Sequence, residues 1–125
     1  MGYIFRFLES TDLGFINMTI KNLSTNRQVL KEMGEPLIVE ENQSWIFCYE
    51  SFKLVGFCAY TDNKILYFYT IPEFRNNGVF NELYNKLPLN EWTVIASNDS
   101  YPIFLKKGFK VIKNYKNCHK LIKKI

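Results

Sequence analysis

The chain has 125 residues, the size of one domain, and carries a net charge of +4. Hydrophobic residues make up 47% and charged residues 22%, which excludes a disordered, collagen-like or low-complexity protein. No apolar run approaches the roughly 20 residues that cross a bilayer. The first ten residues lack the basic segment and long apolar segment of a signal peptide. We therefore expect a single domain over residues 1–125, located in the cytoplasm and not bound to a membrane.

The positive charge is concentrated at the C-terminal end. Residues 106–125 contain eight lysines and no acidic residue, so this segment carries +8. Because the whole chain carries +4, the first 105 residues sum to −4. A basic end on a mildly acidic body indicates an anionic partner. Lysines that keep an exposed edge strand soluble would give the same pattern.

The three cysteines give no sign of a metal site. Cys48, Cys58 and Cys118 lie in apolar or mixed runs and have no C-x-x-C spacing. This spacing predicts neither a zinc site nor a disulfide framework. We expect buried free thiols and no metal.

The N-terminal third predicts a strand followed by two helices. Residues 3–8 are rich in β-formers. Residues 9–12 offer helix-capping side chains, and apolar residues from Phe15 onward recur with weak helical spacing. Ser24 is a second candidate N-cap, and a further apolar stripe ends at Gly34. That stripe consists of Val29, Leu30 and Met33.

From residue 43 the apolar pattern becomes that of strands. Residues 44–49 and 53–60 predict a hairpin. Residues 64–71 form a continuous apolar run, typical of a strand covered on both faces. A helix with one apolar face follows, and residues 92–96 predict a short buried strand. The apolar residues of that helix are Val79, Phe80, Leu83, Tyr84 and Leu87.

The C-terminal part predicts a short helix at about residues 101–107 and a hairpin of residues 109–112 and 118–122. Gly108 ends the helix. The predicted order is β–α–α–β–β–β–α–β–α–β–β. The strand–helix–strand unit at residues 64–97 predicts a right-handed crossover between two parallel strands.

The junction between the buried strand and its helix, residues 71–80, carries the most chemical information. A helix N-terminus presents backbone N–H groups without partners and the positive end of the dipole, so it binds phosphate readily. Gly78 lets the backbone approach an anion, and Arg75 can supply charge.

The junction resembles the GNAT superfamily of acyl-CoA-dependent N-acetyltransferases. The family signature, Arg/Gln-x-x-Gly-x-Gly/Ala, reads RNNGVF here and follows a family-like IPEF. A second family-like segment, SNDSYPIFLKKGF, covers residues 97–109. The resemblance implies an α+β fold: a mixed, mostly antiparallel central sheet of about six to seven strands flanked by about four helices. A parallel βαβ unit would form the coenzyme site.

The resemblance also implies a function, the transfer of an acetyl group from acetyl-CoA directly to a primary amine. The fourth and fifth strands would splay apart around the pantetheine arm, and the loop amides would hold the pyrophosphate. A backbone N–H would polarise the thioester carbonyl. The residues implied to bind acetyl-CoA are Phe68, Tyr69, Thr70, Ile71, Arg75, Asn76, Asn77, Gly78, Val79, Phe80, Asn98, Ser100, Tyr101 and Phe104.

Two departures from the family pattern concern catalysis. Phe80 stands where the family has Gly or Ala, so its ring must point into the core. Phe104 stands where many members have a tyrosine acid, which leaves Tyr101, one turn earlier, as the candidate general acid. No carboxylate lies in the fourth strand, so water, Tyr67 or Tyr69 would carry the proton of the amine.

Three functions remain open, in the order enzyme, acyl-CoA sensor and nucleic-acid binder. The missing acid and base favour a sensor that binds acyl-CoA without turnover. A nucleic-acid binder would use the lysine-rich hairpin, but the aromatic residues lie mostly at buried strand positions. An acidic amine acceptor would suit the lysines. The chain is expected to be a monomer, or a homodimer that pairs through its exposed last strand.

Overall fold

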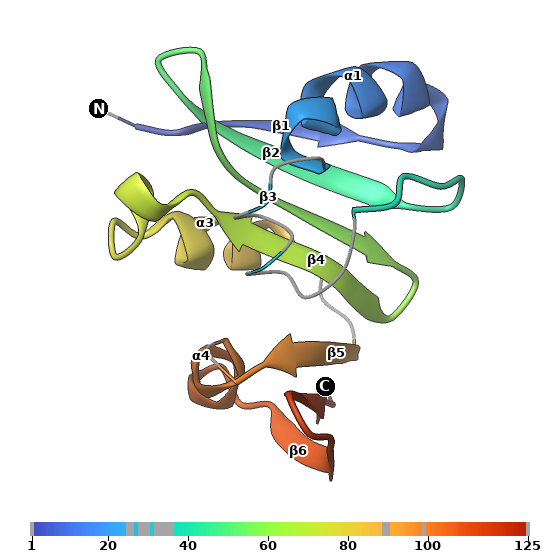
Figure 1. Ribbon diagram of the computed structural model, residues 1–125, viewed down its shortest axis with the longest axis vertical. Helices are drawn as coiled ribbons and strands as arrows, with labels where there is room; N and C mark the ends of the chain where they lie inside the picture. The colour runs from blue at the N-terminus through green and yellow to red at the C-terminus, as the bar shows by residue number, and fades with distance from the viewer. Residues whose placement is uncertain are drawn as a thin grey trace.

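The chain forms one seven-stranded sheet with helices on both faces (Figure 1). The computed structural model describes residues 2–24, 27, 31, 37–88, 91–98 and 100–124, except for the side chains at positions 10 and 22–24. The strand order is β1-β2-β3-β4-β5-β7-β6. Every neighbouring pair is antiparallel apart from β4 and β5, which are parallel. The predicted α+β class, with a mixed and mostly antiparallel sheet and a parallel βαβ unit, is confirmed.

The elements follow the predicted order within the described residues. The strands are β1 (Ile4–Leu8), β2 (Ser44–Glu50), β3 (Lys53–Thr61), β4 (Lys64–Thr70), β5 (Trp92–Ser97), β6 (Lys110–Asn114) and β7 (Cys118–Lys123). The α-helices are α1 (Leu13–Ser24), α3 (Val79–Lys86) and α4 (Tyr101–Lys106), and short 3-10 turns cover Ser10–Asp12 and Pro72–Phe74. None of these helices has the length and apolar composition of a bilayer-spanning helix.

The entry into α1 is fixed by a reciprocal cap, as residues 9–12 predict. The backbone N–H of Asp12 donates to the carbonyl of Glu9 at 2.8 Å, and the Asp12 carboxylate accepts from the backbone N–H of Glu9 at 3.0 Å. Two donors at the start of the helical segment are thereby satisfied. The predicted apolar stripe of Val29, Leu30 and Met33 lies outside the described residues.

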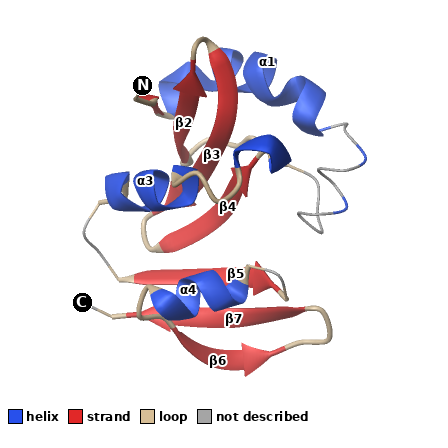
Figure 2. Ribbon diagram, turned by 90° about the vertical axis from the view of Figure 1, so that its left-hand side faces the viewer, coloured by secondary structure: helices blue, strands red, loops and turns tan. Residues whose placement is uncertain are grey.

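Alternating residues of the central strands feed two cores on opposite faces of the sheet. On one face Trp45, Phe47 and Phe57 pack against Ile16 and Ile20 of α1. On the other face, the alternate residues of the same strands pack against α3 and α4, which lie on the same side of the sheet (Figure 2). The residues on that face include Ile46, Cys48, Cys58, Val79 and Leu83, with Phe104 of α4 in an adjoining cluster.

The structure corrects two predictions about the C-terminal hairpin and its neighbour. The last strand, β7, lies inside the sheet between β5 and β6, so the exposed edge is β6. The hairpin sequence contains no signal for which of its two strands pairs with β5. The second correction concerns Ile95, which is 61% exposed although residues 92–96 predict a buried strand.

Gly56 in β3 permits the close approach of α3 to the sheet. It pairs with Cys48 on one side and Thr70 on the other. A Cβ atom built on Gly56 would lie 2.7 Å from Cγ1 of Val79 and 3.0 Å from the carbonyl oxygen of Tyr69. Real Cβ atoms essentially never come so close to a neighbour as the first distance. The first turn of α3 can therefore sit here only because the position has no side chain.

Gly56→Ala should destabilise the fold by about 1–3 kcal/mol, the usual range for overpacking a core. Gly14→Ala is the matched control, because a Cβ at helical Gly14 meets nothing within 4 Å. That control should stabilise the protein by about 0.4–1 kcal/mol. Urea unfolding of both variants measures the difference, and equal effects in the two would contradict the close approach at Gly56.

The three cysteines are free, as predicted. Cys48 and Cys58 are buried, whereas Cys118 is only partly buried. Burial, with smaller contributions from Glu82 and Glu50, raises the pKa of Cys48 to about 11. Burial also raises the pKa of Cys58. Both thiols are thus protonated and shielded at neutral pH.

At pH 8 a chromogenic disulfide reagent should label Cys118 rapidly and should reach Cys48 and Cys58 only after unfolding. The reactive species is the thiolate, which burial suppresses at the two inner positions. Three equally fast thiols in the native protein would refute this expectation.

The same burial predicts a pH dependence of stability. The thiols of the unfolded chain have ordinary pKa values and lose their protons at lower pH than Cys48 and Cys58 do in the folded protein. The free energy of unfolding should therefore fall as the pH rises through about 9.

Candidate functional site

The parallel strands β4 and β5 pair only at their first residues. The register contains two pairs, Lys64 with Thr93 and Ile65 with Val94. The N–H of Thr93 also donates to the carbonyl of Asn63 at 2.8 Å. Beyond Ile65 the two strands diverge, and Figure 2 shows them separating. Their facing backbone groups are not paired with each other there, and such groups need hydrogen-bond partners.

Three phenylalanines fill the space beside this divergence on the α3 and α4 face. Phe68 of β4 stacks on Phe80 of α3 with ring centroids 4.3 Å apart. Phe104 of α4 meets Phe80 edge-on at 5.4 Å and Phe68 at 6.2 Å. We call these residues the phenylalanine wedge. The ring of Phe80 packs against the core, as the departure from the family signature requires.

β4 contains a bulge where the pairing with β5 ends. Ala59 of β3 faces Tyr67, but the next residue, Tyr60, faces Ile65, so β4 has one extra residue, Leu66. A bulge leaves its extra residue out of the ladder and changes the direction of the strand. The sequence contains no signal for this bulge, because the run from Lys64 is uniformly apolar.

The loop before α3 uses two left-handed residues. Asn76 has φ 69° and Gly78 has φ 84°. Gly78 is the N-cap of α3, and its carbonyl accepts from the N–H of Glu82 at 3.0 Å. The N–H groups of the first helical turn have no partner within the helix. Nε of Arg75 donates to the carbonyl of Thr70 at 3.0 Å, which holds that guanidinium beside the end of β4.

A cleft of about 820 Å³ runs from this loop into the divergence. Val94 and Ala96 line it from the α4 face of β5, and Ile95 and Ser97 line it from the opposite face. The cleft therefore passes between the strands and is open to both faces of the sheet. Its volume lies within the range of ligand sites in proteins, about 300–1,000 Å³.

The cleft includes ten of the fourteen residues predicted to bind the coenzyme. Ile71, Asn77, Asn98 and Tyr101 are not part of its lining. The carbonyl of Asn77 instead accepts from the hydroxyl of Tyr3 at 3.1 Å. The predicted residues in the lining are Phe68, Tyr69, Thr70, Arg75, Asn76, Gly78, Val79, Phe80, Ser100 and Phe104.

Sequence reasoning missed the residues that line the inner end and the far wall. The inner end adds residues of β4 and β5 around the two parallel pairs, and α4 adds residues one turn apart. The alternation of side chains along β5 could have identified the β5 residues if the divergence of β4 and β5 had been predicted. The missed residues are Ile65, Leu66, Phe74, Asn81, Val94, Ile95, Ala96, Ser97, Ile103, Lys106 and Lys107. Tyr67, which the sequence analysis names as a candidate proton carrier, also lines the cleft.

Tyr101 packs against His119 and is not part of the cleft lining. The two ring centroids are 4.0 Å apart. The His119 ring nitrogens lie 2.6 Å from Oδ1 of Asn114 and 2.8 Å from Oδ1 of Asn98. This cluster ties the loop after β5 to the far hairpin. Asn98, predicted to contact the coenzyme, lies in this cluster.

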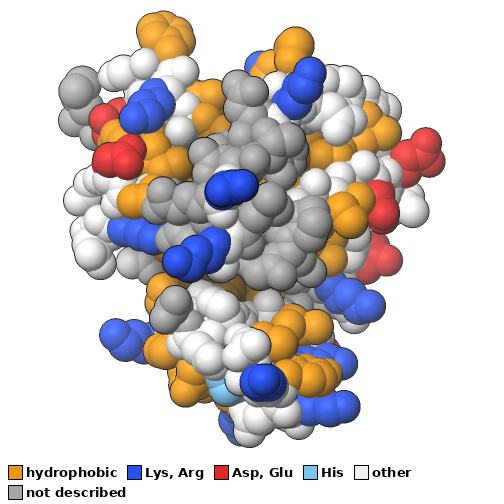
Figure 3. All heavy atoms as spheres, in the orientation of Figure 1, with side chains coloured by type: hydrophobic (Ala, Val, Ile, Leu, Met, Phe, Trp, Pro, Cys, Tyr) orange, Lys and Arg blue, Asp and Glu red, His pale blue; other side chains and the backbone are white. Residues whose placement is uncertain are grey.

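The charged residues of the cleft lining are all basic: Arg75, Lys106 and Lys107. Within the part of the chain that the structure describes, the lining contains no carboxylate and no imidazole. In the view of Figure 3 the acidic side chains lie over the upper part of the molecule, and the lower part shows lysines and arginines. Among the described residues, no group of three His, Cys, Asp or Glu side chains could hold a metal ion.

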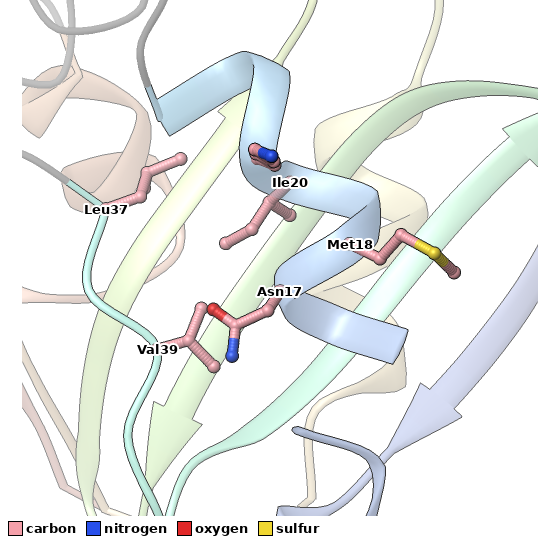
Figure 4. Close-up of a pocket in the computed structure, with 6 residues that line it drawn as sticks. Asn17, Met18, Ile20, Leu37 and Val39 are labelled. Carbon is pink, nitrogen blue, oxygen red and sulfur yellow. The ribbon is translucent and has the colours of Figure 1, made fainter. Parts of the chain in front are cut away.

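A second hollow of about 410 Å³ lies between α1 and residues 37–39. Figure 4 shows Asn17, Ile20, Leu37 and Val39 around it, with Met18 directed away. Lys21 completes its lining. These residues offer one amide and one ammonium group but no carboxylate, thiol or imidazole, so the larger cleft is the better candidate for chemistry.

Comparison with known proteins gives a clear result at the level of structure only. No family model matches the sequence, and no curated protein matches it either. A GCN5-related N-acetyltransferase from Rhodopseudomonas palustris has a similar structure, with a TM-score of 0.70 and 14% identity over 100% of this chain and 97% of that one. PaiA N-acetyltransferase from Thermoplasma acidophilum, solved in complex with coenzyme A, has a TM-score of 0.65 and 14% identity over the whole of both chains.

A third similar structure is that of Arabidopsis thaliana NAA60 in complex with acetyl-CoA. Its TM-score is 0.65, with 11% identity over 99% of each chain. All three similarities span essentially the whole of both chains. This chain therefore has the fold of the GNAT superfamily of N-acetyltransferases.

Proposed function

We propose that this protein is a GNAT-type N-acetyltransferase that transfers the acetyl group of acetyl-CoA directly to a primary amine. One observation carries the proposal. A single cleft joins the N-terminus of α3, which suits a pyrophosphate, to the diverging strands β4 and β5, which suit an extended amide chain. Similar structures have been solved with coenzyme A and with acetyl-CoA.

The residues of the cleft fit the parts of acetyl-CoA. The N–H groups at the start of α3, behind Gly78, would hold the pyrophosphate. Lys106 and Lys107 on the same face would add positive charge for the phosphates. The part of β4 that has diverged from β5 would pair with the amides of the pantetheine arm, as an added strand pairs with a sheet edge.

The bulge at Leu66 would supply the electrophilic assistance. Leu66 lines the cleft at its inner end, where its backbone lies outside the ladder with β3. A backbone N–H aimed into the cleft would stabilise the negative charge that develops on the thioester oxygen. The amine nitrogen bonds to the carbonyl carbon, the carbon–sulfur bond breaks, and the thiolate takes up a proton.

The proton of the amine would leave through water or a tyrosine. Tyr67 and Tyr69 line the cleft, and the hydroxyl of Tyr67 accepts from the N–H of Ile38 at 3.1 Å. That bond holds the Tyr67 hydroxyl in place. A thiol has a pKa near 8.5, so the leaving thiolate needs less help from an acid than an amine would.

A sensor that binds acyl-CoA without turnover is the second candidate function. It is favoured by one observation: the lining residues that the structure describes include no carboxylate and no imidazole. The two functions differ in one readout: an enzyme releases free thiol from acetyl-CoA in the presence of an amine, and a sensor does not.

Substitution of Gly78 tests the coenzyme site. Gly78→Asp places a carboxylate at the N-cap of α3, where it should abolish binding by repelling the pyrophosphate. Asp at an N-cap supports a helix, so the fold should survive. Gly78→Asn is the matched control, because its side chain has the same size and the same tolerance of positive φ but no charge.

The measurement is the thermal shift that acetyl-CoA causes. At about 100 times the dissociation constant it should add roughly 2.7 kcal/mol to the stability of the wild type. The shift should persist in Gly78→Asn and disappear in Gly78→Asp. No shift of the wild type at millimolar acetyl-CoA would refute both the enzyme and the sensor.

The sequence analysis gives Tyr101 as the candidate general acid, and substitution of Tyr101 tests that role. Because its ring packs on His119 outside the cleft lining, we expect Tyr101→Phe to retain kcat within about threefold of the wild type. Loss of a positioned acid would lower kcat by about 10²-fold or more. A drop of that size in steady-state assays would establish Tyr101 as the general acid.

A further inference from the structure

The three-stranded part of the sheet formed by β5, β7 and β6 has a face that no described helix covers. Leu121 of β7 and Val94 of β5 point to the α4 side, where they pack with Phe104. Because side chains alternate along a strand, the neighbours of Leu121 and Val94 in each strand point to the opposite side. On that side Ile95 of β5 is paired with Lys120 of β7, and Lys120 is paired with Lys113 of β6.

This pairing places two lysines directly opposite each other. Residues at such positions lie about 4.5–5.5 Å apart, and like charges there destabilise the sheet. Lys110, paired with Ile122, adds a third lysine to the same face. Among the described residues none of the three forms an ion pair with a carboxylate. Lys113 lies over the ring of Tyr115 at 5.1 Å, and that contact does not neutralise its charge.

The lysine pair lies next to the cleft. Ile95 lines the cleft and is 61% exposed, so the row Ile95, Lys120 and Lys113 begins at the cleft opening on this face. Lys106 at the end of α4 and Lys107 directly after it belong to the opposite face, where the first turn of α3 lines the cleft. The structure therefore has two separate groups of lysines, one on each side of the sheet.

We propose that Lys113 and Lys120 recognise the amine acceptor, and that this acceptor is an acidic polypeptide segment. The inference rests on the proposed acetyltransferase function. Anionic groups about 5–10 Å beyond the cleft opening would lie over the two lysines, given the spacing of strands. Exposed apolar side chains accompany them, namely Ile95 and, at a bulge in β6, Ile112. A peptide with acidic and apolar side chains complements such a face, whereas a polyphosphate complements only its charge.

The test uses two synthetic hexapeptides with a free amino terminus and a fluorophore at the C-terminus. One carries Glu at its second, third and fourth positions, and the other carries Gln there. Fluorescence anisotropy measures their binding to the protein with coenzyme A present. The Glu peptide should bind about tenfold or more tightly than the Gln peptide, and this preference should weaken with added salt.

The variants are matched in charge. Lys113→Glu/Lys120→Glu should abolish the preference for the Glu peptide. Lys116→Glu/Lys124→Glu is the control, because it changes the net charge by the same amount at two exposed residues outside β6 and β7. This control should retain most of the preference for the Glu peptide. Lys113→Gln/Lys120→Gln is the second test pair, and circular dichroism checks the fold of each variant.

Three results would overturn the inference. They are equal binding of the two peptides, equal weakening by the test and control variants, and tighter binding of a single-stranded oligonucleotide of the same charge. The thermal shift with acetyl-CoA separates these failures from failure of the proposed function. If the shift is present and the peptide preference is absent, only the choice of acceptor is wrong.

Discussion

The phenylalanine wedge is the contact on which the site depends. Parallel strands that start side by side normally continue as a hydrogen-bonded ladder, because each unpaired buried N–H or C=O group costs free energy. In this chain the rings of Phe68, Phe80 and Phe104 pack together beside the point where β4 and β5 separate, on the α3 and α4 face. Phe104 is buried and Phe68 and Phe80 are partly buried, so this apolar packing helps to offset the loss of hydrogen bonds between the two strands. The result is a cleft between the strands.

The polar character of the cleft follows from that arrangement. Backbone groups reach the cleft at the start of α3, along β4 and at the bulge at Leu66. Among the described lining residues, the ionisable side chains are two tyrosines, two lysines and one arginine. Chemistry in such a site depends on orientation and electrostatic stabilisation more than on proton transfer by side chains.

Much of this fold could be predicted from the sequence, because its signals are local. The capping residues at Glu9 and Asp12, the apolar period of α3 and the turn at Gly78 each depend on a few neighbouring residues. The predictions failed where the outcome depends on distant pairing. Nothing near Cys118 indicates that β7 lies inside the sheet, and nothing near Leu66 indicates a bulge. Likewise, the apolar run of β5 predicts that Ile95 is buried, because the sequence does not show that β4 diverges from β5.

The short parallel ladder has a mechanical consequence. The sheet is continuous between β4 and β5 through only two residue pairs and the bond from Thr93 to Asn63. The cores lie on opposite faces of the sheet, one around Trp45 and Phe57 and one around Val94 and Phe104, and the second core packs Ile65 of β4 together with Val94 of β5. A molecule that paired with both diverging strands would supply the hydrogen bonds that the two strands do not make to each other. The ligand would then take the place of a missing strand in the middle of the sheet.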